Sequence, residues 1–187
     1  MGYMYGAARS VGATRRCRAM HNHFELFGLP ARFEVDGEPL ERSYREIQSR
    51  VHPDRFANAG DAERRASLQW TTRVNEAYRT LKDPVQRAKH LLELHGVDVA
   101  FETNTAMPSD FLVQQMELRE ALEAAKDAAT LDSLREQLRN SRRALEREVA
   151  QAIDAKKDYP AAANLVRKLQ FLQRLDEEID AAYETME

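Results

Sequence analysis

The chain has 187 residues, of which 43% are hydrophobic and 32% charged, and its formal net charge is −3. That length suits one ordinary domain or two small helical domains. The acidic balance argues against a dedicated nucleic-acid-binding protein, which needs a surplus of Lys and Arg on one face. No apolar run approaches the roughly 18 residues of a membrane span. The single cysteine, Cys17, excludes an internal disulfide and a cysteine-based metal site, and it fits a reducing compartment.

Residues 1–19 differ in composition from the rest of the chain. They contain no acidic residue and no helical apolar period, and their arginines are Arg9, Arg15, Arg16 and Arg18. We expect a disordered extension here. Two interpretations stay open: a transit-like leader, because such leaders are Arg-rich and poor in acidic residues, or upstream sequence before a start at Met20, which we favour.

The next part of the chain predicts two antiparallel helices. The first begins at the start signal formed by Asp36 and Pro39, and its apolar residues recur at i, i+4, i+7 and i+11. These residues are Leu40, Tyr44, Ile47 and Val51. A second helix is expected from about residue 61 to residue 82, packed antiparallel on the first. Its apolar stripe is Trp70, Val74, Ala77 and Leu81.

Asp83 and Pro84 end the second helix and begin a shorter one. Asp caps exposed amides, and Pro is tolerated at the first helical position, where its missing N–H has no partner to lose. The shorter helix, PVQRAKHLLEL, stops just before Gly96. Residues 97–108 show no apolar period, so we expect a linker between two domains there.

Three further helices are expected after the linker. Ser109 or Asp110 can cap the first, Thr130 can cap a long second helix, and Pro160 opens the last. The long helix keeps a near-heptad seam of Leu131, Leu134, Leu138, Leu145, Val149 and Ile153. Short turns between three such helices favour an antiparallel bundle. Because glycine is scarce and no strand-like alternation appears, the whole protein is expected to be all-α.

The stretch VHPDRFANAG, residues 51–60, separates the two long helices. Pro53 lacks a backbone N–H and pushes the residue before it out of the α region, so the first helix must stop near Val51. His52 and Asp54 are then expected at the tip of a loop. An isolated His-Pro-Asp predicts no more than the end of a helix. The side of the first helix opposite its apolar stripe is basic and polar, however, with Arg42, Arg45 and Ser49, and Arg55 beside Asp54 continues the basic character.

A helix with a basic outer face, a His-Pro-Asp loop and an antiparallel helix that carries NEAYRTL together resemble a J-domain. The segment FELFGL at residues 24–29 resembles the short first helix of that family. The resemblance implies docking on the ATPase of a DnaK-type chaperone and faster ATP hydrolysis, with Asp54 pairing with an arginine of the chaperone. The docking residues that it implies are His52, Pro53, Asp54, Arg55, Tyr44, Arg42 and Arg45.

The helix after Pro108 is predicted to have two apolar faces. The face toward the bundle core carries Phe111, Gln115, Leu118 and Leu122. The opposite face carries Leu112, Val113 and Met116, accompanied by Glu117 and Glu120. In the last helix, Phe171 flanks a core stripe of Leu165, Leu169, Leu172, Ile179 and Tyr183. A bundle helix needs one apolar face, so the second face favours a partner surface; packing on the first domain or the linker is a nearly even alternative.

The order of these features is similar to the HscB family, the co-chaperones of iron–sulfur cluster assembly. The similar motifs are FLVQQMELREALE at residues 111–123 and VRKLQFLQRLDEEI at residues 166–179. The resemblance implies a J-domain over residues 20–96, a linker over 97–108 and a three-helix domain over 109–187. It also implies that the last domain binds an IscU-type scaffold and delivers it to an HscA-type chaperone. The scaffold-binding residues carried over by position are Leu112, Val113, Met116, Glu117, Glu120 and Phe171.

The resemblance also sets expectations about partners and location. It implies a monomer that is not an enzyme, needs no cofactor and has neither a nucleic-acid nor a membrane partner. The five histidines show no HExxH-like ligand spacing, so no metal site is expected. Eukaryotic relatives often carry paired CxxC motifs before the J-domain. Their absence here favours a bacterial cytoplasmic protein over one of the mitochondrial matrix.

Three alternatives stay open. The arginines of the first long helix fit an ordinary solvated face, and Glu41 and Glu46 dilute its positive charge. A J-domain also fits a general protein-folding co-chaperone with another client, although the Gly/Phe-rich and cysteine-rich regions usual in such proteins are missing. A non-catalytic helical adaptor fits as well, and it predicts no effect on any ATPase.

Overall fold

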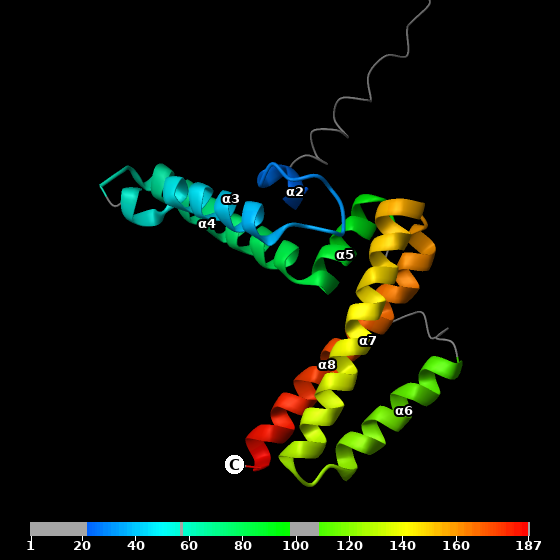
Figure 1. The fold of residues 1–187 in the computed structure, drawn as a ribbon. Coiled ribbons are helices and arrows are strands. Elements are labelled where there is room, and N and C mark those ends of the chain that lie inside the picture. The colour runs from blue at the N-terminus through cyan, green and yellow to red at the C-terminus, as the bar shows by residue number, and fades with distance from the viewer. Residues whose placement is uncertain (1–21, 57, 98–108, 187) are drawn as a thin grey trace, which may run out of the picture. The chain divides into compact units, whose positions relative to one another are not determined.

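The computed structural model describes residues 22–56, 58–97 and 109–186. Every regular element within these ranges is helical, which confirms the all-α prediction (Figure 1). The expected extension over residues 1–19 and nearly all of the expected linker lie outside the described residues. The contacts divide the described residues into two units: the first contains those from Asn22 to Ala31 and from Val35 to Lys82, and the second contains Arg32–Glu34 and those from Asp83 onward.

The first unit is built on a helical hairpin. α3 (Gly37–Val51) begins where the Asp36 side chain accepts the N–H of Glu38 at 3.1 Å. α4 (Asp61–Lys82) returns antiparallel to it, and the one-turn helix α2 (His23–Leu26) packs against α4. The buried apolar residues of these elements are Phe24, Phe27, Leu40, Val74, Ala77 and Leu81. Both long helices therefore have the bounds that the sequence predicts.

The prediction of the apolar stripe of α4 is wrong at one residue, Trp70. Trp70 is 46% exposed, whereas the other three residues of that stripe are fully buried. Ser67, one turn earlier, is only 4% exposed. Its hydroxyl donates at 2.6 Å to the carbonyl of Val51, one of the acceptors left open at the C-terminus of α3. A small polar side chain that supplies a hydrogen bond therefore takes the inner position near the loop.

In the second unit, the described residues form four helices and the short π-helix η2. α5 (Pro84–Leu94) begins at the predicted cap, where the Asp83 side chain accepts the N–H of Gln86 at 2.8 Å. It ends before Gly96, which takes the left-handed φ of 75° that glycine tolerates best. α5 packs against α8 (Tyr159–Met186). The division of contacts falls between Lys82 and Asp83, before the domain end expected at residue 96. The domain limits stay predictions.

α6 (Ser109–Ala124), α7 (Ala128–Ala150) and α8 form the three-helix part of this unit. α7 runs antiparallel to α6 and α8. The seam predicted for the long helix is buried or half-buried along its length. It shares a core cluster with α8 that consists of Leu134, Leu138, Leu172, Leu175 and Ile179, and Leu118 and Leu122 of α6 pack against this cluster.

Three helix boundaries differ from the prediction. α6 already includes Ser109, and Asp110 falls inside the helix as well. α7 is capped by Asp127, whose side chain accepts the N–H of Thr130 at 2.7 Å, so the predicted cap Thr130 lies inside the first turn. The end of the long helix also widens, because η2 (Gln151–Lys156) is a π-helix. Pro160, by contrast, falls in the first turn of α8 as predicted.

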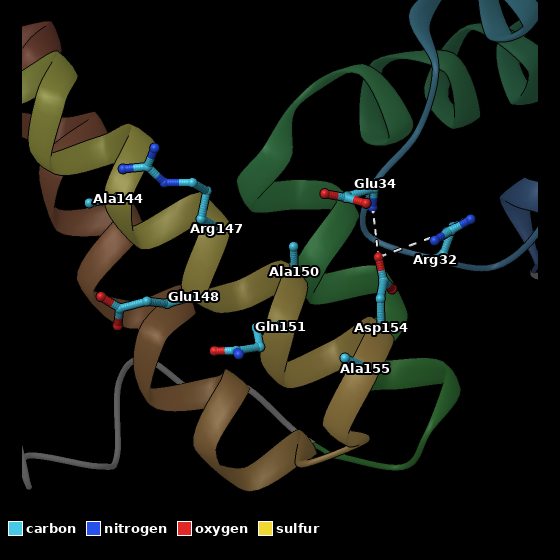
Figure 2. A pocket seen from close by; sticks show the side chains of 9 residues that line it. All are labelled: Arg32, Glu34, Ala144, Arg147, Glu148, Ala150, Gln151, Asp154 and Ala155. Atoms are coloured by element: carbon cyan, nitrogen blue, oxygen red, sulfur yellow. Dashed lines mark hydrogen bonds and ion pairs between the residues drawn. The ribbon is translucent and has the colours of Figure 1, made fainter.

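The three residues Arg32–Glu34 of the second unit are held by η2. The carboxylate of Asp154 accepts the N–H of Phe33 at 2.7 Å and that of Glu34 at 2.9 Å. The Phe33 ring is buried, and the guanidinium of Arg87 lies 5.0 Å from its centroid. Beside Asp154 a groove of about 660 Å³ opens along α7 and η2 (Figure 2).

Candidate functional site

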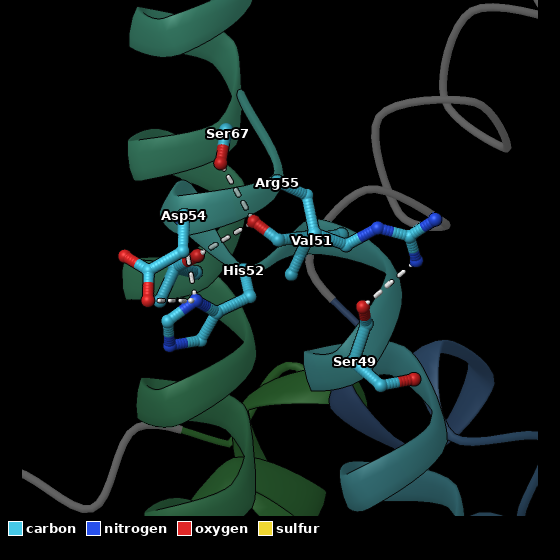
Figure 3. Close-up of polar contacts among 7 residues, drawn as sticks. Ser49, Val51, His52, Asp54, Arg55 and Ser67 are labelled. Atoms are coloured by element: carbon cyan, nitrogen blue, oxygen red, sulfur yellow. Dashed lines mark hydrogen bonds and ion pairs between the residues drawn. The ribbon is translucent and has the colours of Figure 1, made fainter. Parts of the chain in front are cut away.

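The His-Pro-Asp loop joins α3 to α4 (Figure 3). Its backbone is fixed from the α4 side, because the carbonyl of Val51 accepts the hydroxyl of Ser67 at 2.6 Å and that of Thr71 at 3.1 Å. His52 has an extended backbone with ψ of 130°, as a residue before proline should. Pro53–Phe56 then form a short 3₁₀-helix, η1. The predicted break is therefore an ordered turn.

The Asp54 side chain is 90% exposed, and its Oδ2 lies 3.5 Å from Nδ1 of His52 (Figure 3). The backbone N–H of Asp54 donates to Nδ1 of His52 at 3.3 Å, so the imidazole stabilises the turn. On the other side, Nη1 of Arg55 donates to the carbonyl of Ser49 at 3.0 Å, which fills one of the open acceptors at the end of α3. The loop thus presents an exposed carboxylate on a turn that its neighbours hold in place.

The outer face of α3 carries charges of both signs. Arg42 and Arg45 are exposed, as is Glu46. Arg45 forms an ion pair with Glu41, one turn earlier. An exposed ion pair of this kind is weak, so it does not hold Arg45 away from a partner. Glu41 lowers the net positive charge of this face, but the guanidinium of Arg45 stays exposed to solvent. Both arginines remain accessible to a partner.

Tyr44 was predicted both in the apolar stripe and on the docking face. Its ring stacks on Tyr78 of α4 with the centroids 4.0 Å apart. Its hydroxyl donates to Oδ1 of Asn75 at 3.0 Å and accepts from Gln48 at 2.9 Å. The side chain is half-buried. Tyr44 therefore packs the hairpin, and its docking role stays a prediction.

The second candidate site is the outer face of α6. Leu112 is 43% exposed, Val113 53% and Met116 62%. Glu117 and Glu120 are exposed on the same helix, Glu117 four residues after Val113 and Glu120 four residues after Met116. Among the described residues, nothing covers the three apolar side chains. We call these five residues and Phe171 the α6 patch.

Phe171 is the most firmly held member of the α6 patch. It is half-buried and packs against the core cluster of the bundle. Its ring meets that of Phe111 edge-on, with the centroids 5.8 Å apart and 83° between the planes. The guanidinium of Arg119 lies 5.6 Å from the Phe171 centroid and 3.5 Å from the carboxylate of Glu178. The bundle core, Phe111 and Arg119 therefore hold the ring in place.

Sequence reasoning missed two cations that lie over the rings of Phe111 and Phe171. Arg119 lies over Phe171, and Nζ of Lys168 lies 5.1 Å from the ring centroid of Phe111. Each pair crosses from one helix to another, so no spacing within either helix indicates it. The sequence does place Arg119 one turn after Met116, which is the only signal that it carries.

The described ranges hold no group of three or more His, Cys, Asp or Glu side chains suited to a metal ion. In the same part of the chain, no helix is long and apolar enough to cross a membrane. The two sites offer other chemistry: an outward carboxylate on a fixed turn, and an exposed apolar face bordered by carboxylates. Both are features of protein–protein contacts.

Comparison with known proteins places the chain in a family. A family model described as the HSCB C-terminal oligomerisation domain matches residues 107–180. The co-chaperone protein HscB homolog of Azoarcus sp. (strain BH72) is 49% identical over 169 residues, which cover 89% of this chain and 96% of that protein. This chain belongs to the HscB family. The HscB homolog of Burkholderia thailandensis is 52% identical over 169 residues, with the same coverage of both chains.

Solved HscB structures have the same helical fold. The chaperone HscB from Vibrio cholerae superposes with a TM-score of 0.78 at 38% identity, covering 89% of this chain and 99% of that one. Human co-chaperone protein HscB gives a TM-score of 0.84 at 26% identity, covering 97% and 95%. The HscB resemblance predicted from the order of the motifs is therefore confirmed, and with it a co-chaperone role in iron–sulfur cluster assembly.

Proposed function

We propose that this HscB-family protein links a chaperone ATPase to an iron–sulfur scaffold protein. One end docks on an HscA/DnaK-type chaperone and stimulates its ATP hydrolysis, and the other binds an IscU-type scaffold and delivers it to that chaperone. The observation that carries the proposal is the 90% exposed Asp54 carboxylate on an ordered turn. The proposed docking residues are His52, Pro53, Asp54, Arg55, Tyr44, Arg42 and Arg45.

At the loop, the trigger is a charged pair between Asp54 and an arginine of the chaperone. A bidentate pair of this kind is directional as well as attractive, which suits a contact that must fix one orientation. His52 and Arg55 already hold the turn, so docking loses little conformational entropy there. The exposed arginines of α3 attract an acidic partner surface and speed the encounter.

At the other end, the scaffold covers the α6 patch. Interfaces of this type have an apolar centre and a polar rim, and the patch matches that plan, with three exposed apolar side chains beside two exposed carboxylates. Phe171 supplies a rigid wall because the bundle core holds its ring. The iron–sulfur cluster is then cargo of the scaffold, and no step requires this protein to bind metal.

The remaining expectations belong to the same proposal. Relatives in Azoarcus and Burkholderia are bacterial, which supports a cytoplasmic protein. The expected monomeric state needs its own test, because the family model that matches residues 107–180 is described as an oligomerisation domain. Sedimentation of the full chain distinguishes a monomer from an oligomer.

Two variants test the two ends separately. Asp54→Asn removes the carboxylate charge but keeps its size, and we expect stimulation of the chaperone ATPase to fall at least about thirtyfold, the equivalent of roughly 2 kcal/mol. Leu112→Ala combined with Met116→Ala shrinks the α6 patch, and scaffold affinity should fall at least about tenfold. Each variant should leave the other activity unchanged, since the two sites share no residue.

Two matched variants serve as controls. Glu63→Gln removes an exposed carboxylate from the start of α4, and Leu68→Ala removes an exposed leucine from the same helix. Neither should alter ATPase stimulation or scaffold binding. The docking assignment is wrong if Asp54→Asn stimulates like the unmodified protein. The patch is wrongly placed if the α6 double variant keeps full scaffold affinity.

A further inference from the structure

Trp70 is the only tryptophan of the chain, and 46% of it is exposed. The large exposed apolar residues of the described ranges are Leu68, Trp70, Leu112, Val113 and Met116. The last three belong to the α6 patch, which leaves two on α4 without a role. Tryptophan carries one of the largest apolar surfaces of any side chain together with one N–H donor, a combination enriched at protein interfaces. Its exposure therefore leaves a large apolar surface for a partner to cover.

Trp70 lies at the loop end of the apolar stripe of α4, which is buried farther along the helix. Val74, one turn later, is fully buried, as are Ala77 and Leu81. Helix α2, which contacts α4 as α3 does, has a single turn, and Figure 1 shows it beside the hairpin at the end away from the loop. The loop end of the stripe is consequently open, and the indole occupies it.

This open surface adjoins the His-Pro-Asp loop. Ser67 and Thr71, which lie on either side of Trp70 in the sequence, both donate to the carbonyl of Val51, directly before His52. Trp70 is therefore within one helical turn, about 5.4 Å along the axis, of the residues that anchor the loop. A protein that covers Asp54 has the indole within reach of the same contact.

A cation fixes the indole. The guanidinium carbon of Arg73 lies 5.6 Å from the ring centroid of Trp70, a cation–π contact. Such a contact restricts the ring before binding, so less rotamer entropy is lost when a partner covers it. Trp and Arg are the residue types most enriched among those that dominate binding energy at interfaces. Together they call for a partner surface that is apolar and bordered by carboxylates.

We propose that Trp70 is an apolar anchor for the chaperone ATPase that docks on the His-Pro-Asp loop, with Arg73 as its positioning residue. The chaperone offers it an apolar hollow bordered by carboxylates, next to the arginine that meets Asp54. This inference rests on the proposed docking function. Because the anchor acts through burial, it raises the affinity of the complex and leaves the trigger at Asp54 unchanged.

The single tryptophan permits a direct test on the full chain. Replacing it with 5-fluorotryptophan gives one ¹⁹F resonance, which is observed while the ATP-bound, unlabelled chaperone is added. We expect this resonance to shift and broaden, and to become less accessible to a soluble paramagnetic agent. The Asp54→Asn protein at the same chaperone concentration should keep the resonance of the free state.

Variants then separate affinity from triggering. Trp70→Ala should raise the concentration needed for half-maximal ATPase stimulation about tenfold, with the same maximal rate. Leu68→Ala is the matched control, because Leu68 is 55% exposed on the same helix but about 160° away around its axis. It should stay within about twofold of the unmodified protein. Circular dichroism checks that both variants fold.

Three results would overturn the proposal. If the protein with the native side chain at Asp54 stimulates the ATPase while its ¹⁹F resonance stays unchanged at saturating chaperone, docking does not involve Trp70. If the resonance shifts with the concentration of this protein alone, the indole binds a second copy of the chain. If the unmodified protein gives no stimulation at all, the docking function itself fails, and the proposed anchor fails with it.

Discussion

Asp154 shows how one side chain can hold a distant part of the chain. Its carboxylate accepts two backbone N–H groups, from Phe33 and Glu34, while only 11% of the side chain is exposed. No periodicity connects residues 120 positions apart, so sequence reasoning could not find this contact. Asp54 is the opposite case, because proline chemistry and the loop position predicted its exposure from local sequence alone.

Removing the Asp154 carboxylate should destabilise the protein. Asp154→Ala leaves the two N–H groups without their charged acceptor, and we expect the free energy of unfolding to fall by about 2 kcal/mol. Urea denaturation measures this change, and amide hydrogen exchange at Phe33 and Glu34 should accelerate. Glu148→Ala removes an exposed carboxylate from the same groove and should change stability by at most about 0.5 kcal/mol. Unchanged protection of both amides in Asp154→Ala would contradict this account.

At the scale of elements, the helices were predictable and their caps only in part. Proline and apolar spacing gave α3, α4 and α5 their bounds, because those signals are local. The two apolar faces of α6 were also predicted, and the exposure of Leu112, Val113 and Met116 confirms the outer one. The cap of α7 was missed because Asp127 and Thr130 are both good caps in the sequence, and only the hydrogen bond decides between them.

The Asp127 cap predicts a pH dependence for α7. The N–H of Thr130 donates to this carboxylate and holds its pKa below the ordinary value of 3.8. A depressed pKa means that the stabilisation is present at neutral pH, above the unfolded pKa, and is lost as the pH falls through the folded value.

Thermal unfolding at several pH values tests this dependence. Asp127→Ala should lower the unfolding temperature at pH 7, and the difference from the unmodified protein should shrink as Asp127 becomes protonated. Thr130→Val keeps the backbone N–H, so it should have the smaller effect. If Thr130→Val destabilises as much as Asp127→Ala, Thr130 contributes as much to the cap.

At the scale of the whole molecule, the order of motifs was enough to predict the fold class and the family. The division of contacts was not predictable, because α5 and the segment Arg32–Glu34 follow α2 or α4 in the sequence yet pack with the later helices. Tertiary packing decides which unit a segment joins, and the local sequence pattern does not indicate it. The two proposed interfaces lie in different units, on α3 and its loop and on α6 with α8.

A steady-state ATPase assay of the specialised chaperone tests the central claim most directly. It compares the chaperone alone, with this protein, with the scaffold, and with both. If the protein links the two partners, the rate with both present should exceed the sum of the two separate stimulations, because scaffold capture and docking then act on the same chaperone molecule. A rate that does not change when this protein is added, with or without the scaffold, would contradict the account.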